Sequence, residues 1–224
     1  MITAQGLRPY VTLKLATSLD GRIAAANGES RWITGAEARA AVHAMRAAHD
    51  AIVVGIGTAL ADDPELTVRT DPAPQQQPAR VVIDSQCRLR PGSKLVRSAR
   101  AGRVIVYVTE TSALEKRAAL ADAGVDVRVT RGLMGKVDLT QALADLQSVG
   151  LLRVFVEGGG QLAAALIEAE LVDRLEWMRA PILLGAGGVP AIAPLRDERL
   201  SAAPRWRRVD VRSVGVDLWE TYEL

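Results

Sequence analysis

A lysine within an apolar segment is the first residue of this chain that could do chemistry. The segment 10–16 is expected to be a strand, with Leu13 and Leu15 on one face. Lys14 and Ala16 lie on the other face. Because lysine is rarely buried without a partner, Lys14 is expected at a strand end, at a water-filled cleft, or against an anion or carbonyl. The chain has 4 Lys and 24 Arg, which favours a need for a compact charge here. An edge-strand lysine that prevents aggregation is the alternative.

Three consecutive glycines join a predicted strand to a predicted helix. Glu157 ends the strand, Gly158, Gly159 and Gly160 follow it, and Gln161 opens the helix. Glycines let the backbone approach a ligand closely, and free amides at a helix N-terminus favour phosphate. The run lacks the Lys and Ser/Thr of a Walker loop and the usual position of the dinucleotide fingerprint. The pattern favours ligand binding over the alternative of a tight turn.

Carboxylates and arginines in the first third of the chain are further candidates. Asp62 and Asp63 precede a proline, where one of them could face a cleft and act as an acid or base. Alternatively, the pair caps a turn. Arg46 and Arg69 are candidate phosphate forks, although each could instead be a solvated surface residue.

The segment 29–34 brings hydroxyls, amides and an indole in front of a predicted helix. Its hydroxyls and amides could bind an anion, and Trp32 could cover a planar ring. Packing of Trp32 onto the helix as a hydrophobic staple is the alternative.

The elements that must position these residues alternate between strand and helix, which predicts an α/β fold. We expect a largely parallel sheet that ends in an antiparallel hairpin. Capping boxes are expected at Thr34 and Ser112, a capping Asp138 before another helix, and helix ends at Gly124 and Gly150. The expected strands cover residues 10–16, 50–57, 80–84, 103–108, 125–129, 151–156, 173–179, 205–212 and 215–222.

Composition excludes several classes of protein. At 224 residues we expect a single domain, residues 1–224. The net charge of +2 and 4% aromatic residues give no reason to expect a nucleic-acid partner. One cysteine, Cys87, excludes a disulfide framework and a multi-cysteine zinc site, and no metal is expected. No apolar run approaches the roughly 20 residues needed to span a bilayer, and no signal peptide is evident. The cytoplasm is the expected location.

Several segments together resemble the reductase half of the bacterial bifunctional riboflavin-biosynthesis deaminase/reductase. The resemblance covers essentially the whole chain, and the DDPxLTVR block is highly specific. It implies a three-layer α/β/α fold like that of dihydrofolate reductase, use of NADPH, and reduction of a ribosylamino group on a phosphorylated pyrimidine. The matching segments read LKLATSLDGRIA from Leu13, GESRWIT from Gly28, VGIGTALADDPELTVR from Val54, VIDS from Val82, VEGGG from Val156, LVDRL from Leu171 and APILLG from Ala180.

The resemblance also implies a role for each matching residue. Lys14 reads a pyrimidine carbonyl. Asp62 is the carboxylate beside the ribose, and Glu157 is the carboxylate that precedes the glycine loop. The substrate-phosphate contacts are Ser30, Arg46, Arg69 and the Leu66 backbone. The NADPH contacts are Ala16, Trp32, Thr34, Thr58, Ser85, Gly158, Gly159, Gly160 and Gln161, of which Ser85 meets the 2′-phosphate.

This chain departs from the bifunctional family in one respect. The family carries a zinc deaminase with a His-x-Glu and Cys-x-x-Cys pattern, and that pattern is absent from this sequence. We therefore expect a stand-alone reductase or an excised domain, forming a homodimer. The expected substrate is 5-amino-6-(5-phosphoribosylamino)uracil, because archaeal and fungal reductases of the undeaminated diamino-pyrimidinone tend to have Asn in place of Lys14. The chain could instead be a reductase of a pterin such as dihydrofolate, or a non-catalytic nucleotide-binding regulatory module. Intact Lys14, Asp62, Arg46 and Arg69 count against the regulatory module.

Overall fold

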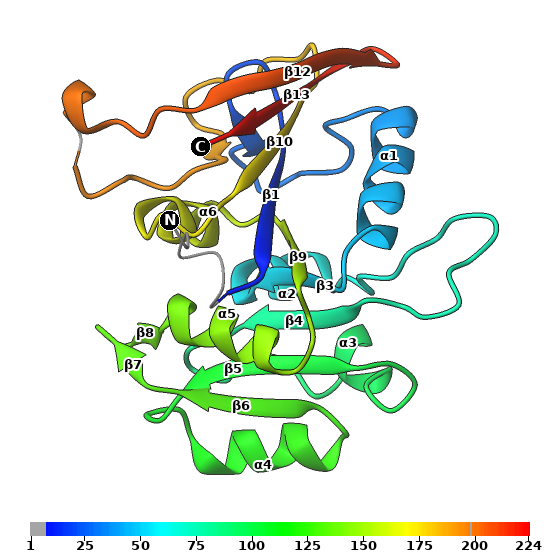
Figure 1. Cartoon of the computed structure of the whole chain (residues 1–224), viewed down its shortest axis with the longest axis vertical. Coiled ribbons are helices and arrows are strands. Elements are labelled where there is room, and N and C mark those ends of the chain that lie inside the picture. Colours follow the sequence, from blue (N-terminus) through cyan, green and yellow to red (C-terminus); the bar gives the residue numbers. More distant parts are fainter. Residues whose placement is uncertain (1–7, 198) are drawn as a thin grey trace, which may run out of the picture. The chain divides into compact units, whose positions relative to one another are not determined.

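The computed structural model describes residues 8–197 and 199–224. The chain divides into two compact units (Figure 1). Of the described residues, unit 1 comprises 8–10 and 46–155, and unit 2 comprises 11–45, 156–197 and 199–224.

Unit 1 is built on parallel strands that are adjacent in the order β3-β4-β5-β6 (Figure 1). Most of these strands are rich in valine and isoleucine, as expected where both faces of a parallel sheet are covered. The strands are β3 (Ala51–Gly55), β4 (Ala79–Ile83), β5 (Val104–Thr109), β6 (Asp126–Thr130) and, at the end of the unit, β9 (Arg153–Glu157). The remaining elements are α2 (Ile56–Asp62), α3 (Lys94–Arg97), α4 (Leu114–Asp122), α5 (Leu139–Ser148) and the small hairpin of β7 (Gly132–Leu133) and β8 (Lys136–Val137).

Different helices cover the two faces of this sheet. On one face, Val54 and Val106 belong to an apolar cluster with Leu95 of α3 and Leu120 of α4. Tyr107, the neighbour of Val106 on β5, points to the opposite face and is fully buried there. Unit 1 is therefore a three-layer α/β/α arrangement, as predicted.

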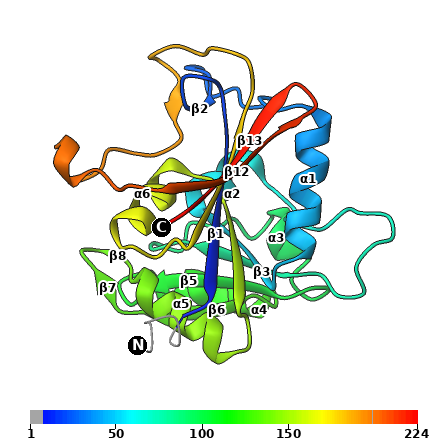
Figure 2. The ribbon, with the colours of Figure 1, turned by 45° about the horizontal axis from the view of Figure 1, so that its top comes forward.

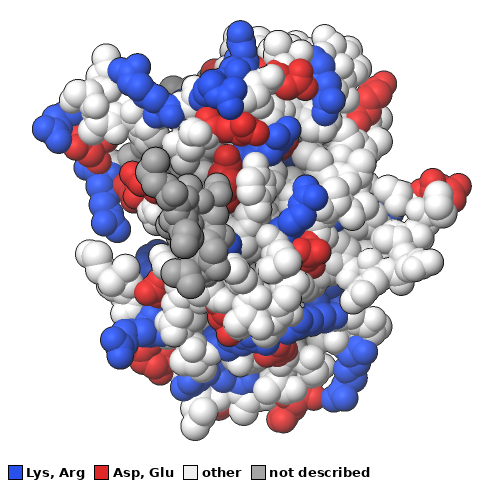
Figure 3. Space-filling model, viewed as in Figure 1, with Lys and Arg blue, Asp and Glu red and all other residues white. Residues whose placement is uncertain are grey.

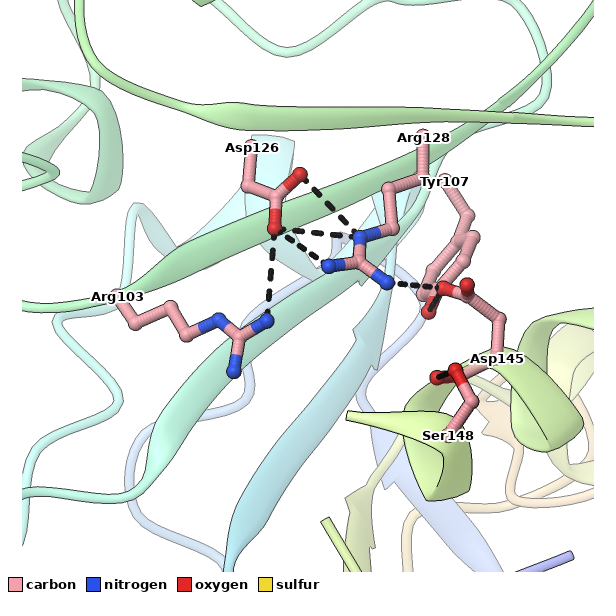
Figure 4. A network of polar contacts seen from close by, with 6 residues as sticks. All are labelled: Arg103, Tyr107, Asp126, Arg128, Asp145 and Ser148. Atoms are coloured by element: carbon pink, nitrogen blue, oxygen red, sulfur yellow. Dashed lines mark hydrogen bonds and ion pairs between the residues drawn. The ribbon is translucent and has the colours of Figure 1, made fainter. Parts of the chain in front are cut away.

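A polar network attaches α5 to that opposite face (Figure 4). The Tyr107 hydroxyl donates to Asp145 Oδ2 at 2.6 Å, and Arg128 Nη1 donates to the same oxygen at 2.5 Å. Arg128 Nη2 also donates to Asp126 Oδ2 at 2.9 Å. Burial, followed by the bond to Asp145, raises the pKa of Tyr107 above its ordinary value. The hydroxyl therefore stays protonated and donates its hydrogen to α5.

Unit 2 contains strands in the order β12-β13-β10-β1. β1 and β10 are parallel, whereas β10, β13 and β12 form antiparallel pairs. The strands are β1 (Tyr10–Thr17), β10 (Arg174–Arg179), β12 (Arg207–Val214) and β13 (Asp217–Glu223), with a second small sheet of β2 (Arg22–Ala24) and β11 (Val189–Pro190). The helices are α1 (Ala36–Ala47), α6 (Gly160–Glu168) and the 3₁₀ turn η2 (Leu200–Ala202).

A buried carboxylate crosslinks the strands of unit 2. Glu176 Oε2 accepts hydrogen bonds from Trp219 Nε1 at 2.6 Å and Thr221 Oγ1 at 2.7 Å. Its other oxygen accepts from Arg174 Nε at 2.6 Å. A buried charge is tolerated when it is paired and hydrogen-bonded in this way.

The structure confirms the predicted α/β class, the parallel strands and the C-terminal antiparallel hairpin. Asp138 caps α5, because its Oδ1 accepts from Gln141 N at 3.1 Å. Gly124 and Gly150 follow helix ends with φ values of 96° and 81°, as a left-handed helix end requires.

The capping box predicted at Ser112 is wrong. Helix α4 begins at Leu114 with Ala113 at its N-cap and no side-chain cap. The Ser112 hydroxyl instead donates to Thr109 O at 2.7 Å, a local bond that competes with capping. Helix α1 begins at Ala36, one residue later than a cap at Thr34 would require.

We predict that Tyr107→Phe lowers the free energy of unfolding by about 1.5–3 kcal/mol, because it removes a buried hydrogen bond to a charged acceptor. Urea denaturation measures this change. Ser148→Ala is the control, since the Ser148 hydroxyl donates within its own helix, to Asp145 O. It should cost less than about 0.5 kcal/mol. Equal losses in the two variants would contradict the anchoring role of Tyr107.

Candidate functional site

In unit 2, β1 presents Lys14 on the more open face of its strand. Leu13 and Leu15 are buried, whereas Lys14 and Ala16 are half-buried, so the predicted alternation is confirmed over residues 13–16. Thr12, which shares the face of Lys14, is buried as well. In the parallel pairing with β10, Lys14 lies opposite the buried Glu176. The two β1 residues expected to contact ligands thus share one face.

The turn that follows β1 is held by the Asp20 carboxylate. Ser18 Oγ donates to Asp20 Oδ1 at 2.6 Å. The amides of Leu184 and Gly185 donate to Oδ1 and Oδ2 at 3.1 and 2.7 Å. These bonds, that from Ser18 foremost, lower the pKa of Asp20 to about 2. Asp20 is therefore an ionised, structural carboxylate.

Residues 180–193, called the bridging segment here, connect this turn to the glycine loop within unit 2. Near its start, Leu19 N donates to Ile182 O at 2.8 Å. In its middle, β11 pairs with β2. Strand β2, labelled in Figure 2, follows the turn directly. At its end, Ala193 N donates to Gly160 O at 3.0 Å. Two motifs more than a hundred residues apart in sequence are thus joined by one segment.

The loop between β9 and α6 requires glycine at its three positions for two different physical reasons. Gly158 and Gly159 have φ values of 78° and 94°, which favour glycine. At Gly160, a Cβ atom would lie 2.7 Å from Pro190 O of the bridging segment, so no side chain fits. No side chain caps α6. The amides of its first turn, including those of Gly160 and Gln161, therefore have no intrahelical acceptor and suit an anion.

Trp32 lies beside arginine rather than in an apolar core. Its side chain is 68% exposed, which excludes a buried staple. The Arg39 guanidinium of α1 lies 4.5 Å from the Trp32 ring centroid, and Arg39 Nη1 donates to Thr34 O at 2.7 Å. Arg39 thus holds two residues of the predicted cofactor set, Trp32 and the buried Thr34. Its role was not predicted, because no spacing rule links an arginine in a helix to an upstream tryptophan.

In unit 1, the two adjacent aspartates have different environments. Asp62 is the half-buried last residue of α2, a helix that the sequence did not predict. Asp63 has a left-handed backbone with a φ of 40°, and its Oδ1 accepts from Lys94 N at 2.9 Å. The turn-capping alternative therefore describes Asp63, which leaves Asp62 as the candidate acid.

The segment that follows carries a strained residue. Leu66 is buried with a φ of 53°, a conformation that is uncommon for a bulky side chain and is found at ligand sites. Arg46 Nη1 donates to Thr67 O at 2.9 Å and so contacts the same segment. Arg69 lies 3.6 Å from Glu65 in an exposed ion pair, which is a weak interaction. Arg46 therefore contacts the backbone of Thr67, which follows Leu66 in the chain.

Ser85 lies directly after β4 with its acceptor capacity partly used. Val137 N donates to Ser85 Oγ at 3.0 Å, and Thr109 Oγ1 donates to Ser85 O at 2.7 Å. The hydroxyl proton of Ser85 remains able to donate. Thr58 is half-buried in the first turn of α2, after the exposed Gly57.

The remaining predicted residues lie in unit 2. Glu157 is the half-buried last residue of β9, immediately before the glycine loop, and Ser30 is half-buried after the turn at 25–29.

On the face shown in Figure 3, acidic and basic side chains are interspersed, unlike the continuous basic surface of many nucleic-acid-binding proteins. Among residues 8–197 and 199–224, no helix is long and apolar enough to cross a membrane.

Known proteins resemble this chain over nearly all of its length. Residues 9–219 match the family described as RibD C-terminal domain. The riboflavin biosynthesis protein RibD of Escherichia coli K12 is 38% identical over 223 residues, which are 94% of this chain and 58% of that protein. A 2,5-diamino-6-ribosylamino-4(3H)-pyrimidinone 5′-phosphate reductase of Methanothermobacter thermautotrophicus is 41% identical over 181 residues, covering 80% of this chain and 81% of that protein.

The similarity extends to solved structures. Acinetobacter baumannii RibD has a TM-score of 0.83 and 31% identity, over 97% of this chain and 58% of that one. The chain thus spans less than two thirds of the RibD proteins that it matches. These similarities confirm the predicted fold family.

We predict that Asp20→Asn removes an acid-sensitive part of the stability. The folded-state pKa is lowered from 3.8 to about 2, so the ionised carboxylate stabilises the fold above about pH 4. That contribution is lost as the pH falls through about 2. The melting temperature of the variant should therefore lie below that of the wild type at pH 6 and approach it at pH 2.5. A difference in melting temperature that is constant with pH would contradict this role.

Proposed function

Because the chain belongs to the family of RibD C-terminal domains, we propose that it is an NADPH-dependent 5-amino-6-(5-phosphoribosylamino)uracil reductase. The proposal rests above all on the start of α6, where two glycines with positive φ and one under the bridging segment leave the helix uncapped. Such a start suits the pyrophosphate of a dinucleotide.

The proposed NADPH contacts fit the chemistry of their groups. Ser85 has a proton to donate to a 2′-phosphate, and Arg88 and Arg90 follow it in exposed positions. Trp32 offers an exposed aromatic surface, already held by Arg39. The other proposed contacts are Ala16, Thr34, Thr58, Gly158, Gly159, Gly160 and Gln161.

The proposed substrate contacts divide between base and phosphate. Lys14 donates to a pyrimidine carbonyl, which suits an ammonium with three donors and no acceptor. Arg46 and Arg69 bind the phosphate with Ser30 and with the Leu66 backbone, whose conformation is maintained by burial of its side chain. We further propose that the chain acts as a single functional domain, as a homodimer, in the cytoplasm.

The reaction requires proton transfer and hydride transfer. The ribosylamine ring opens when the bond between C1′ and the ring oxygen breaks, the oxygen takes a proton, and an imine forms between C1′ and nitrogen. We assign Asp62 as the acid and Glu157 as the second carboxylate, which stabilises positive charge on the imine. NADPH, when bound, supplies the hydride that reduces C1′, and the nitrogen becomes an amine.

A second candidate is reduction before deamination. The Methanothermobacter relative is named as a reductase of the diamino-pyrimidinone, and it matches this chain at 41% identity. NADPH oxidation with each pyrimidine, and with dihydrofolate, tests the proposal. We expect turnover with the uracil substrate. Turnover with neither pyrimidine, in a folded protein that binds NADPH, would contradict a reductase.

We predict that Asp62→Asn folds normally and loses about 100- to 10,000-fold in kcat, because the amide cannot donate a proton as an acid. Steady-state NADPH oxidation measures the loss. Asp63→Asn is the matched control, since the Asp63 carboxylate accepts from the Lys94 amide. It should alter stability more than kcat. A drop of only a few-fold in Asp62→Asn would transfer the acid role to Glu157 or to water.

We predict that Lys14→Asn narrows or reverses the preference for the uracil over the diamino-pyrimidinone. An exocyclic amino group facing Lys14 leaves a charge unpaired, which costs on the order of 1–3 kcal/mol, or about 5- to 150-fold in specificity. Asparagine supplies both an acceptor and donors. The measurement is the ratio of kcat/KM for the two substrates in each protein. An unchanged ratio would show that Lys14 does not read the base.

A further inference from the structure

Unit 1 contains a cavity of about 280 Å³ whose lining is dominated by cations. Three of its six lining residues are basic, against a single carboxylate, Glu65. None of the six is among the residues proposed above to contact substrate or cofactor. The lining residues are Glu65, Thr67, Arg80, Lys94, Arg97 and Ser98.

The innermost cation is Arg80, which is only 4% exposed. Arg80 Nη1 donates to Ser98 Oγ at 2.6 Å, and Nη2 donates to Ser98 O at 3.1 Å and Gly102 O at 2.6 Å. All three acceptors are neutral. Burial lowers the pKa of Arg80, because the charged form loses hydration. Buried charges are normally paired, so the positive charge here lacks its usual compensation.

The other two cations of the lining, Lys94 and Arg97, also lack a carboxylate partner among the described residues. Within residues 8–197 and 199–224, no carboxylate lies within 4.0 Å of the charged nitrogens of Arg80, Lys94 or Arg97. Glu65 pairs with Arg69 instead. Lys94 and Arg97 lie one turn apart on α3 and are exposed, so both can reach an ion at the cavity mouth.

We propose that this cavity binds a small phosphate-bearing anion. The Arg80 guanidinium, which already donates to three neutral acceptors, attracts such a group by its buried charge. The exposed Lys94 and Arg97 donate hydrogen bonds to the phosphate oxygens. The lining holds no aromatic side chain, so no base or ring is recognised by stacking. The site is separate from the residues of the proposed reaction, although Thr67 also contacts Arg46 through its carbonyl.

The test is a titration of the ¹⁵N-labelled chain with inorganic phosphate at low ionic strength, following the amides of Ser98 and Gly102. Ser98 lines the cavity, and Gly102 accepts a hydrogen bond from Arg80. We expect saturable shifts that sodium chloride at matched ionic strength does not produce. The absence of saturable shifts in the wild type would overturn the proposal.

Variants separate the site from general charge effects. Lys94→Ala/Arg97→Ala keeps the buried Arg80 and should weaken phosphate binding at least tenfold. Lys116→Ala removes an exposed cation of α4 outside the lining and should change it less than twofold. Glu65→Gln should tighten binding, since it removes the only carboxylate of the lining. Equal effects of the double variant and Lys116→Ala would overturn the proposal.

A second titration, with ribose 5-phosphate, distinguishes a phosphorylated metabolite from inorganic phosphate as the natural ligand. Binding more than tenfold tighter than that of inorganic phosphate supports a phosphorylated metabolite as the ligand. Equal affinity supports the same site with the phosphate group alone recognised.

Discussion

The close passage of the backbone at Gly160 is the constraint on which the architecture of unit 2 depends. Pro190 O lies 2.7 Å from the position that a Cβ atom of residue 160 would occupy, so the bridging segment can cross the glycine loop only above a glycine. The same segment is fastened at its other end to Asp20, through the amides of Leu184 and Gly185. The turn after β1 and the start of α6 are therefore positioned by one piece of chain, and a change at either end is transmitted to the other.

This arrangement explains why the motifs shared with the reductase family include residues, such as Asp20, that have no direct chemical role. Asp20 is ionised and hydrogen-bonded to structural amides, so its place in the Ser-Leu-Asp-Gly turn is that of a clamp. In unit 1, Asp63 has a comparable role at the start of α3, beside the half-buried Asp62. In each unit, a structural carboxylate supports a segment that carries a residue of the proposed reaction.

Local patterns in the sequence predicted local structure well. The alternation of β1, the Asp138 cap and the helix ends at Gly124 and Gly150 depend on residues within a few positions of one another. The capping box predicted at Ser112 was wrong because a local acceptor, Thr109 O, competes for the Ser112 hydroxyl. The pairing of β2 with β11 was not predictable, since strands of two or three residues carry no periodicity and their partners lie far apart in the chain. For the same reason, the resemblance identified the APILLG motif without indicating that it joins two others.

Transfer of deuterium from NADPH to the substrate tests the proposed reduction at the reacting carbon itself. The chain would be supplied with 5-amino-6-(5-phosphoribosylamino)uracil and NADPH labelled at either the pro-R or the pro-S position of C4. We expect that one labelled form, and not the other, places one deuterium on C1′ of the ribitylamino product, as mass spectrometry and NMR would show. A reduced product without deuterium from either form, or oxidation of NADPH without a ribitylamino product, would contradict it.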